Sequence, residues 1–248
     1  MPTKKTNTEE AIENDAAKPA RGHVHDHVQR YMRRGLMVGA FLPGQVMSLR
    51  KLAVGLGTSP MPVREVLSGL VVANALEETK GGSLRVPRLS SDKLSELFSV
   101  REMLEGTATE MAAKKARPEL IDNLTTINRQ LLVAIENRDI LNCLSFNQKF
   151  HFTLYEAAGS EVLMPLIESL WLQSGPTIYM SLLIPSMPWS AAHHKEILAA
   201  LRRNEAPAAK KAVIQDIRTT GKALLSVTGS QGLELLFAHN SELQFDYE

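Results

Sequence analysis

The chain has 248 residues, a net charge of +1 and 44% hydrophobic residues, enough apolar material for two domains with real cores. Its single cysteine, Cys143, excludes an internal disulfide, and no apolar run approaches the roughly 18 residues of a membrane span. These properties indicate a soluble cytoplasmic protein and exclude disulfide-stabilised and membrane-spanning classes.

Charge is distributed unevenly along the chain. Residues 25–90 hold nine Lys/Arg against four Asp/Glu, whereas residues 91–229 hold fifteen of each. The last nineteen residues carry four acids and neither Lys nor Arg. A basic front segment beside a neutral body is the pattern expected when one domain contacts nucleic-acid phosphates.

The first third of the chain predicts an arm followed by three helices. Residues 1–22 are polar and lack a repeating apolar pattern, which indicates a disordered arm. A basic helix is expected around residues 26–34, and a second helix from Ser48, its capping residue, to Leu56. A third helix is expected from Pro60 to about Asn74, because its prolines are confined to the first turn.

Two short strands are expected after the third helix, at residues 76–79 and 84–87. Between them the run Lys80-Gly81-Gly82-Ser83 is a glycine turn, which is typical of a β-hairpin. Three helices and a hairpin wing predict a winged helix-turn-helix over residues 23–89. In this architecture the later helix of the helix-turn-helix lies in the major groove of DNA.

The third helix has an apolar face, on which four residues are expected to be buried: Val63, Val66, Leu67 and Leu70. Met61, Arg64 and Ser68 then lie together on the opposite face at positions i, i+3 and i+7. The Arg64 guanidinium is suited to guanine O6 and N7, and Met61 to a thymine methyl. Glu65 would repel phosphate and is expected to form an internal salt bridge instead.

Further DNA contacts are predicted around this helix. Ser59 and the free amides of the helix N-terminus suit a phosphate. Arg50 is placed for the DNA backbone or the groove edge, and Lys80 with Gly81 at the wing tip for phosphate or the minor groove. The alternative, in which Arg64 and Lys80 are merely solvated surface charges, is disfavoured because turn, caps, wing and basic bias agree.

The rest of the chain predicts an all-α bundle of six or seven helices over residues 91–228, which makes the fold mainly α. Breaks fall at Pro118, Arg138-Asp139, Gly159, Pro185/Pro188 and Pro207. They separate amphipathic patterns at 91–115, 118–137, 139–158, 160–183, 189–203 and 207–227. An acidic tail, residues 229–248, follows and is expected to be poorly ordered.

The front domain resembles the winged-helix domain of the GntR family of bacterial transcription regulators, over the run Gly39 to Val86 with Leu42-Pro43-Gly44, Leu52-Ala53, Leu56-Gly57, Pro62-Val63-Arg64-Glu65 and Leu70. The helical remainder resembles that family's FadR-type effector domain, often called FCD, at Arg101, Glu105, Phe150-His151, His194 and Ile197-Leu198. The resemblance implies a homodimer on a short palindromic operator and a small carboxylate metabolite in the C-terminal domain. Pro60 departs from many members, which carry a DNA-gripping arginine there.

Four polar residues lie on inward stripes of three bundle helices: Asn147, His151, His194 and Asp216. Burying them unpaired would cost on the order of 1–3 kcal/mol each, and a divalent cation would satisfy all four. The resemblance implies a site of Asp or Asn plus three histidines, so the carboxylate of Asp216 favours Zn, Ni, Mn or Fe over copper. The alternative is a set of hydrogen-bonded core residues without metal. His193 is a register rival to His194, which is favoured because Ile197 and Leu201 follow at i+3 and i+7.

Arg101 lies on an apolar stripe of the first bundle helix. Its guanidinium suits the carboxylate of an effector, and the alternative is a salt bridge to Glu105 at i+4. The main functional hypothesis is therefore a ligand-responsive DNA-binding regulator, most often a repressor. Two alternative hypotheses assign the chain to other functional classes. One is an architectural DNA-binding protein with a structural bundle, and the other is a non-haem metal enzyme built on two histidines and one carboxylate.

Overall fold

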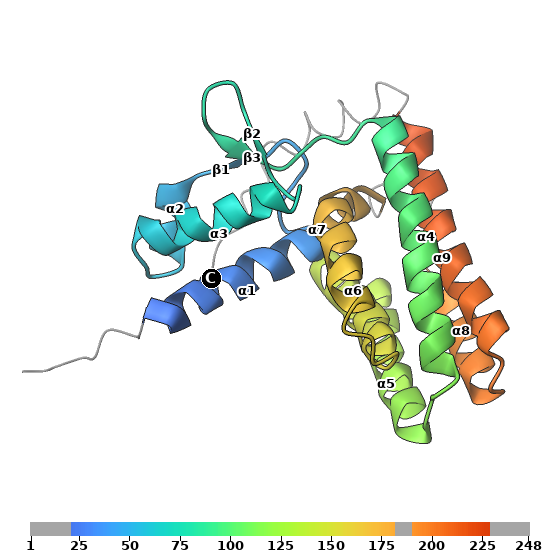
Figure 1. The fold of residues 1–248 in the computed structure, drawn as a ribbon. Helices are drawn as coiled ribbons and strands as arrows, with labels where there is room; N and C mark the ends of the chain where they lie inside the picture. The colour runs from blue at the N-terminus through green and yellow to red at the C-terminus, as the bar shows by residue number, and fades with distance from the viewer. Residues whose placement is uncertain (1–20, 182–189, 229–248) are drawn as a thin grey trace, which may run out of the picture.

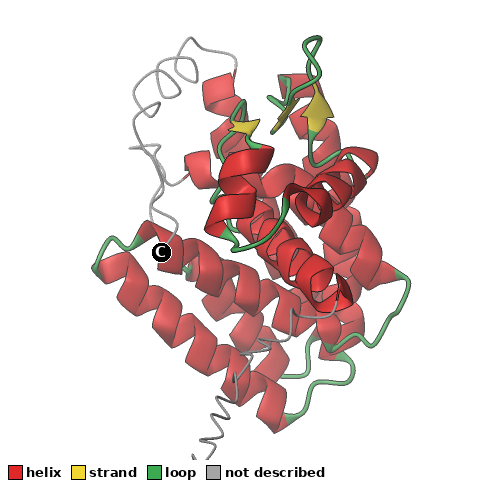
Figure 2. Cartoon of the chain, turned by 90° about the vertical axis from the view of Figure 1, so that its left-hand side faces the viewer, coloured by secondary structure: helices red, strands yellow, loops and turns green. Residues whose placement is uncertain are grey.

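The computed structural model describes residues 21–181 and 190–228. Nine helices and three short strands make up this part of the chain, so the predicted mainly α fold is confirmed. The strands gather at one end of the molecule, which is otherwise helical (Figure 2). Most of the predicted N-terminal arm, all of the predicted acidic tail and the start of the pattern at 189–203 lie outside the described residues.

The N-terminal domain contains the predicted three helices and wing. Its elements are α1 (Arg21–Met37), β1 (Val46–Met47), α2 (Leu49–Gly55), α3 (Pro60–Val72), β2 (Glu77–Glu78) and β3 (Leu84–Arg85). β3 lies between β1 and β2 and pairs antiparallel with both, so the predicted hairpin is the larger part of a three-stranded sheet. The sequence did not predict β1.

Local chemistry places α2 and α3. The Ser48 hydroxyl accepts a hydrogen bond from the Lys51 amide and caps α2 as predicted. Gly57 adopts a φ of 59°, a left-handed conformation that glycine tolerates, and so turns the chain between the two helices. The four α3 residues expected inside are buried: Val63, Val66, Leu67 and Leu70.

The C-terminal domain is a bundle of six described helices: α4 (Ser91–Ala113), α5 (Pro118–Glu136), α6 (Ile140–Glu156), α7 (Leu163–Ser181), α8 (Ala192–Arg202) and α9 (Ala206–Thr228). Several breaks fall where the sequence predicted them, with Pro118 opening α5, Asp139 capping α6, and Gly159 at φ 63° after α6. Helices α4 and α9 run side by side along one edge of the bundle (Figure 1). No described helix combines the length and the apolar composition that a membrane span requires.

The two domains meet where α1 packs against α7. The approach is close because Gly175 of α7 carries no side chain: a Cβ there would lie 2.2 Å from the carbonyl oxygen of Leu36. An ion pair between Arg33 and Glu168 flanks the contact. One continuous hydrophobic cluster therefore extends from the winged-helix core into the bundle.

Candidate DNA-binding face and metal-effector site

The polar face of α3 lies opposite its buried stripe. Met61, Arg64 and Ser68 are all exposed, with Met61 56% accessible. Val72, at the end of the same helix, is also exposed, so Met61 is not the only apolar residue of α3 outside its core. The structure thus brings the three predicted residues together on one accessible face.

The other predicted DNA contacts are also exposed: Arg50, Ser59, Lys80 and Gly81. The loop between β2 and β3, which holds the last two, projects from the domain (Figure 1). Within the described parts of the chain, the cations Arg50, Arg64 and Lys80 take part in no ion pair. Ser59 stands at the N-cap of α3 without a capping side-chain bond, so its hydroxyl and the nearby amides remain available to an anion.

The expectation for Glu65 is wrong. The side chain is exposed, and among the described residues no salt bridge joins it to a cation. Glu65 lies four positions after Met61 and three before Ser68, so it shares their exposed face of α3 and its carboxylate points into solvent.

The bundle holds a partly open cavity of about 220 Å³. Apolar side chains from α5, α6 and α7 form part of its wall, including Leu131, Leu144 and Ile178. Its polar part includes all five residues that the sequence singled out in this domain: Arg101, Asn147, His151, His194 and Asp216. Asn147 lies half-buried in the wall one turn before His151.

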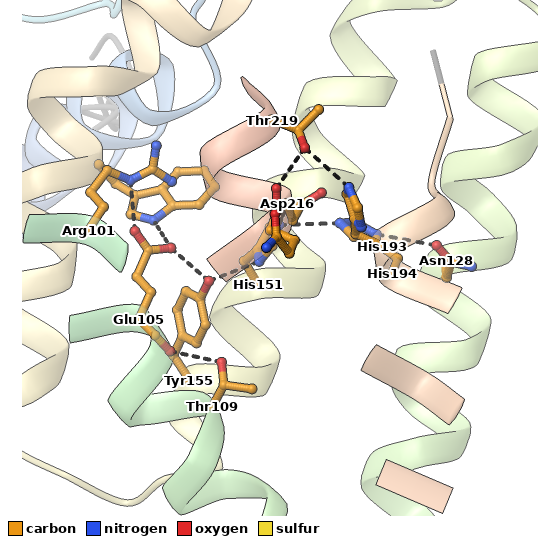
Figure 3. A network of polar contacts seen from close by, with 12 residues as sticks. Arg101, Glu105, Thr109, Asn128, His151, Tyr155, His193, His194, Asp216 and Thr219 are labelled. Atoms are coloured by element: carbon orange, nitrogen blue, oxygen red, sulfur yellow. Dashed lines mark hydrogen bonds and ion pairs between the residues drawn. The ribbon is translucent and has the colours of Figure 1, made fainter. Parts of the chain in front are cut away.

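Three of these residues bring their donor atoms together from α6, α8 and α9 (Figure 3). The His151 Nε2 atom lies 3.2 Å from His194 Nε2 and 3.1 Å from an Asp216 carboxylate oxygen. One ligand atom from each of the three lies within 4.8 Å of the others. Both histidines are 2% exposed, so water reaches them only through the cavity.

Burial and mutual charge set the protonation of this cluster. Burial lowers the pKa of His194 to about 3, against the opposing attraction of Asp216, so the ring is neutral near pH 7. Burial opposes ionisation of Asp216, but its hydrogen bond with His151 and the adjacent histidines hold its pKa at about 2. The result is a neutral nitrogen beside a carboxylate, the charge state in which both coordinate a cation.

The nearby thiol in the cavity wall does not join the donor set. Burial, helped by the charge of Asp139, raises the pKa of Cys143 to about 11, which keeps it protonated. Only a thiolate is a good ligand. The cluster therefore offers nitrogen and oxygen donors alone.

A buried hydrogen-bond network backs the cluster on the α4 side (Figure 3). Glu105 pairs with Arg101 at 2.7 Å and accepts further bonds from Tyr155 at 2.7 Å and Trp171 at 3.0 Å. The Tyr155 hydroxyl in turn lies 2.9 Å from His151 Nδ1. On the other side, Asn128 lies 3.3 Å from His194 Nδ1.

The salt bridge that the sequence offered as the alternative role of Arg101 is present. It uses the Nε atom, and within the described residues the two Nη atoms make no hydrogen bond to the protein. The guanidinium also stacks against Trp171 and Phe98, at 4.7 and 4.9 Å from their ring centres. Since Arg101 lines the cavity, its unused N–H groups can meet an anion there.

Sequence reasoning missed the partners that support the cluster. Asn128 carried a detectable signal, because it is the polar residue on the buried stripe of α5 between Leu124 and Leu131. Tyr155 follows His151 by four positions and so shares its face of α6. His193 lies at the cavity with an accessible side chain (27%), whereas His194 is buried in the cluster.

Comparison with known families agrees with this two-domain geometry. Residues 25–86 match the family described as bacterial regulatory proteins, gntR family, and residues 96–219 match the FCD domain. The chain belongs to the GntR family. It is a transcriptional regulator with an FCD domain and not an enzyme, because the families and relatives that it matches are transcriptional regulators.

Individual relatives extend the similarity over most of the chain. The HTH-type transcriptional regulator McbR of Escherichia coli K12 is 30% identical over 152 residues, which cover 61% of this chain and 69% of McbR. The HTH-type transcriptional repressor RspR of the same organism is 22% identical, covering 82% of this chain and 90% of RspR. A solved structure of E. coli McbR/YncC superimposes with a TM-score of 0.72 at 24% identity, covering 88% of this chain and 99% of that one.

Proposed function

We propose that this GntR-family regulator is a sequence-specific, ligand-responsive repressor in the bacterial cytoplasm. In this proposal its winged helix binds a palindromic operator, and its FCD cavity binds a small carboxylate metabolite with the help of a divalent metal. The observation that carries the effector half is the convergence of His151, His194 and Asp216 on a cavity that also exposes Arg101.

The DNA half rests on the exposed set around α3. Arg64, Arg50 and Lys80 are free of internal ion pairs among the described residues, so DNA phosphates and bases do not have to displace a protein partner. The family resemblance implies a DNA-gripping arginine in many members where this chain has Pro60, which leaves more of the DNA contact to Arg64 and Arg50. A bidentate contact from arginine to guanine contributes about 1–3 kcal/mol of discrimination.

The metal half rests on donor type and spacing. Neighbouring ligands about 2.0–2.1 Å from an ion stand about 2.8–3.4 Å from one another, from octahedral to tetrahedral geometry. The separations of 3.1 and 3.2 Å at His151 fall in that range. Two imidazoles and one carboxylate, with Asn147 on the same wall, fit Zn, Ni, Mn or Fe. A bound ion would supply a positive charge to the cavity and attract an oxygen donor of the effector.

The cavity limits the effector in size and chemistry. Its volume of about 220 Å³ is below the roughly 300–1,000 Å³ of pockets for drug-sized ligands, so it suits a small metabolite. The Nη groups of Arg101 favour a carboxylate, and the leucines and isoleucines of the wall favour an apolar carbon chain. A metal-independent effector, held by Arg101 and hydrogen bonds alone, is the second candidate because the histidines already contact one another.

Regulation requires communication between the cavity and the DNA face. Helix α7 lines the cavity through Trp171 and Ile178, and the same helix touches α1 of the winged-helix domain through Gly175. A homodimer would present two α3 helices to two half-sites, and an effector that moves α7 would change their spacing. The name of RspR, a transcriptional repressor, supports repression as the direction of regulation.

Mobility shifts of DNA from the chain's own upstream region test the DNA half. We expect wild type and the bundle-surface control Arg129→Ala to bind with equal selectivity. Arg64→Ala should lose discrimination against single base-pair changes by about 5- to 150-fold, corresponding to 1–3 kcal/mol. Unchanged selectivity in Arg64→Ala would remove α3 from the reading role.

Thermal unfolding of the full chain tests the effector half. Protein stripped with a chelator is heated alone, with Zn²⁺, Ni²⁺ or Mn²⁺, and with each ion plus a panel of hydroxy-, oxo- and dicarboxylic acids of three to six carbons. A ligand at 100 times its dissociation constant stabilises by about 2.7 kcal/mol, so true ligands raise the melting temperature. Ion-dependent shifts that persist in His151→Ala and His194→Ala would place the metal elsewhere, and acid shifts without any ion would favour the second candidate.

A further inference from the structure

In the hydrogen-bond network behind the histidine cluster, the donor and the acceptor of each bond are set by which groups can donate a proton. We propose that Tyr155, held by Glu105, is a positioning residue that keeps the proton of His151 on Nδ1 and directs Nε2 towards the cation. This inference rests on the proposed metal site and adds a residue pair that orients one of its ligands.

The assignment of donors and acceptors starts from the Glu105 carboxylate. A carboxylate ion-paired to a guanidinium accepts hydrogen bonds and donates none. Its Oε1 takes the bond from Arg101 Nε, and its Oε2 takes bonds from Trp171 Nε1 and the Tyr155 hydroxyl. Tyr155 therefore donates its hydroxyl proton to Glu105.

Because the Tyr155 hydroxyl has no second proton, its remaining lone pairs can only accept hydrogen bonds. The nearby group in position to donate is His151 Nδ1, 2.9 Å away, so that nitrogen carries a proton. If the bond ran the other way, Tyr155 would give its proton to His151, and its oxygen would face the Glu105 carboxylate at 2.7 Å without a proton between them. Two unprotonated oxygens at that distance repel each other strongly in a buried site.

Burial makes the donor and acceptor roles in this network hard to reverse. Glu105 and Tyr155 are 0% exposed and Arg101 is 3% exposed, so solvent cannot replace a lost bond. Burial and the adjacent Glu105 charge also raise the pKa of Tyr155 well above its ordinary value of 10, so the hydroxyl keeps its proton. The whole chain of donors then points from His151 through Tyr155 to Glu105.

At the other end of the His151 ring, Nε2 faces the cavity. It faces a carboxylate oxygen of Asp216 at 3.1 Å and His194 Nε2 at 3.2 Å. A ring whose Nδ1 proton is fixed can offer Nε2 to a cation without first moving a proton across the imidazole. Orientation of metal-bound histidines by such hydrogen bonds typically contributes 10- to 100-fold to metal affinity.

The test compares Tyr155→Phe with Tyr179→Phe. Both remove one hydroxyl from a buried tyrosine, but Tyr179 lies on α7 and takes part in no bond of this network. In the full chain we expect the Zn²⁺ dissociation constant, measured by chelator competition, to rise 10- to 100-fold in Tyr155→Phe. It should stay unchanged in Tyr179→Phe. Equal Zn²⁺ affinity in the two variants would overturn the proposal.

A second readout needs no metal. Nitrogen NMR of the chelator-stripped chain with ¹⁵N-labelled histidine, at pH 8, reports which ring nitrogen of His151 is protonated. The signals are assigned by their loss in His151→Ala. We expect a proton on Nδ1 in wild type, whether or not Nε2 is also protonated, and a neutral ring with bare Nδ1 in Tyr155→Phe. A bare Nδ1 in wild type would overturn the proposal, even in a chain that binds Zn²⁺ tightly. A chain that binds no ion but keeps the Nδ1 proton would refute the metal site alone.

Discussion

Replacing Gly175 by alanine tests how closely the two domains are joined. An added Cβ would lie 2.2 Å from the Leu36 carbonyl oxygen and 2.7 Å from that of Met37. Ordinary contacts between carbon and carbonyl oxygen are about 3.3 Å or longer, so α1 and α7 would have to separate by about 1 Å. Both obstacles are backbone atoms of α1, which no side-chain rotation relieves.

The expected cost follows from two opposing effects. Overpacking of a close contact typically costs about 1–3 kcal/mol, and alanine in place of glycine inside a helix returns about 0.5–1 kcal/mol. We therefore expect Gly175→Ala to lower the free energy of unfolding by up to about 2.5 kcal/mol in urea titrations. The control is Gly69→Ala in α3, where an added Cβ meets nothing within 4 Å and should stabilise the chain by about 0.5–1 kcal/mol. If both variants stabilise equally, the domains are not packed as described.

Three further predictions concern the DNA face and the histidine cluster. Lys80→Ala should weaken operator binding by a similar factor for all sequences and reduce the slope of log K against log salt by about 1, measured by fluorescence anisotropy; a sequence-dependent loss would contradict a phosphate role. Asp216→Asn should abolish any rise in melting temperature with Mn²⁺, because the site loses its one anionic donor; a retained rise would exclude Asp216 as a ligand. In chelator-stripped protein, the folded pKa of His194, about 3 against 6.5, means that the folded chain binds fewer protons than the unfolded chain between these values. Stability to urea should therefore fall as pH is lowered from about 6.5 towards 3. The fall should be shallower in His194→Asn, and equal slopes would show that His194 is accessible to protons.

Much of the fold was predictable because its signals are local. Pro118, Asp139 and Gly159 end or begin helices through their own backbone and side-chain chemistry, so the bundle helices fall close to the predicted boundaries. The two-residue strand β1 was not predictable, because alternation needs more residues than it has. Helix α1 begins earlier and ends later than the predicted 26–34, and its last turn buries Leu36 and Met37 beside α7, a tertiary contact that no local pattern reports.

The candidate site was likewise predictable in part. His151, His194 and Asp216 were predicted to share the interior because each sits on an apolar helical stripe, and periodicity reports which face is buried. Periodicity does not report the rotation of one helix against another, which decides whether Trp171 of α7 meets Glu105 of α4. The sequence accordingly left the partner of Arg101 open.

Glu105 connects the two halves of the proposed function. Its carboxylate holds Arg101 at the cavity, Tyr155 behind the proposed metal ligands, and Trp171 on the helix that contacts the winged-helix domain. A buried charge with three donors is costly to disturb, since loss of one partner leaves the others without compensation. In the proposed function, an effector carboxylate that draws the Arg101 guanidinium towards itself would change the bonds at Glu105. The indole of Trp171 would then respond, and the α7 contact with α1 at Gly175 would carry the change to the DNA-binding domain. The cavity and the DNA face therefore need no contact of their own, because α7 lines the cavity and also touches α1 of the DNA-binding domain.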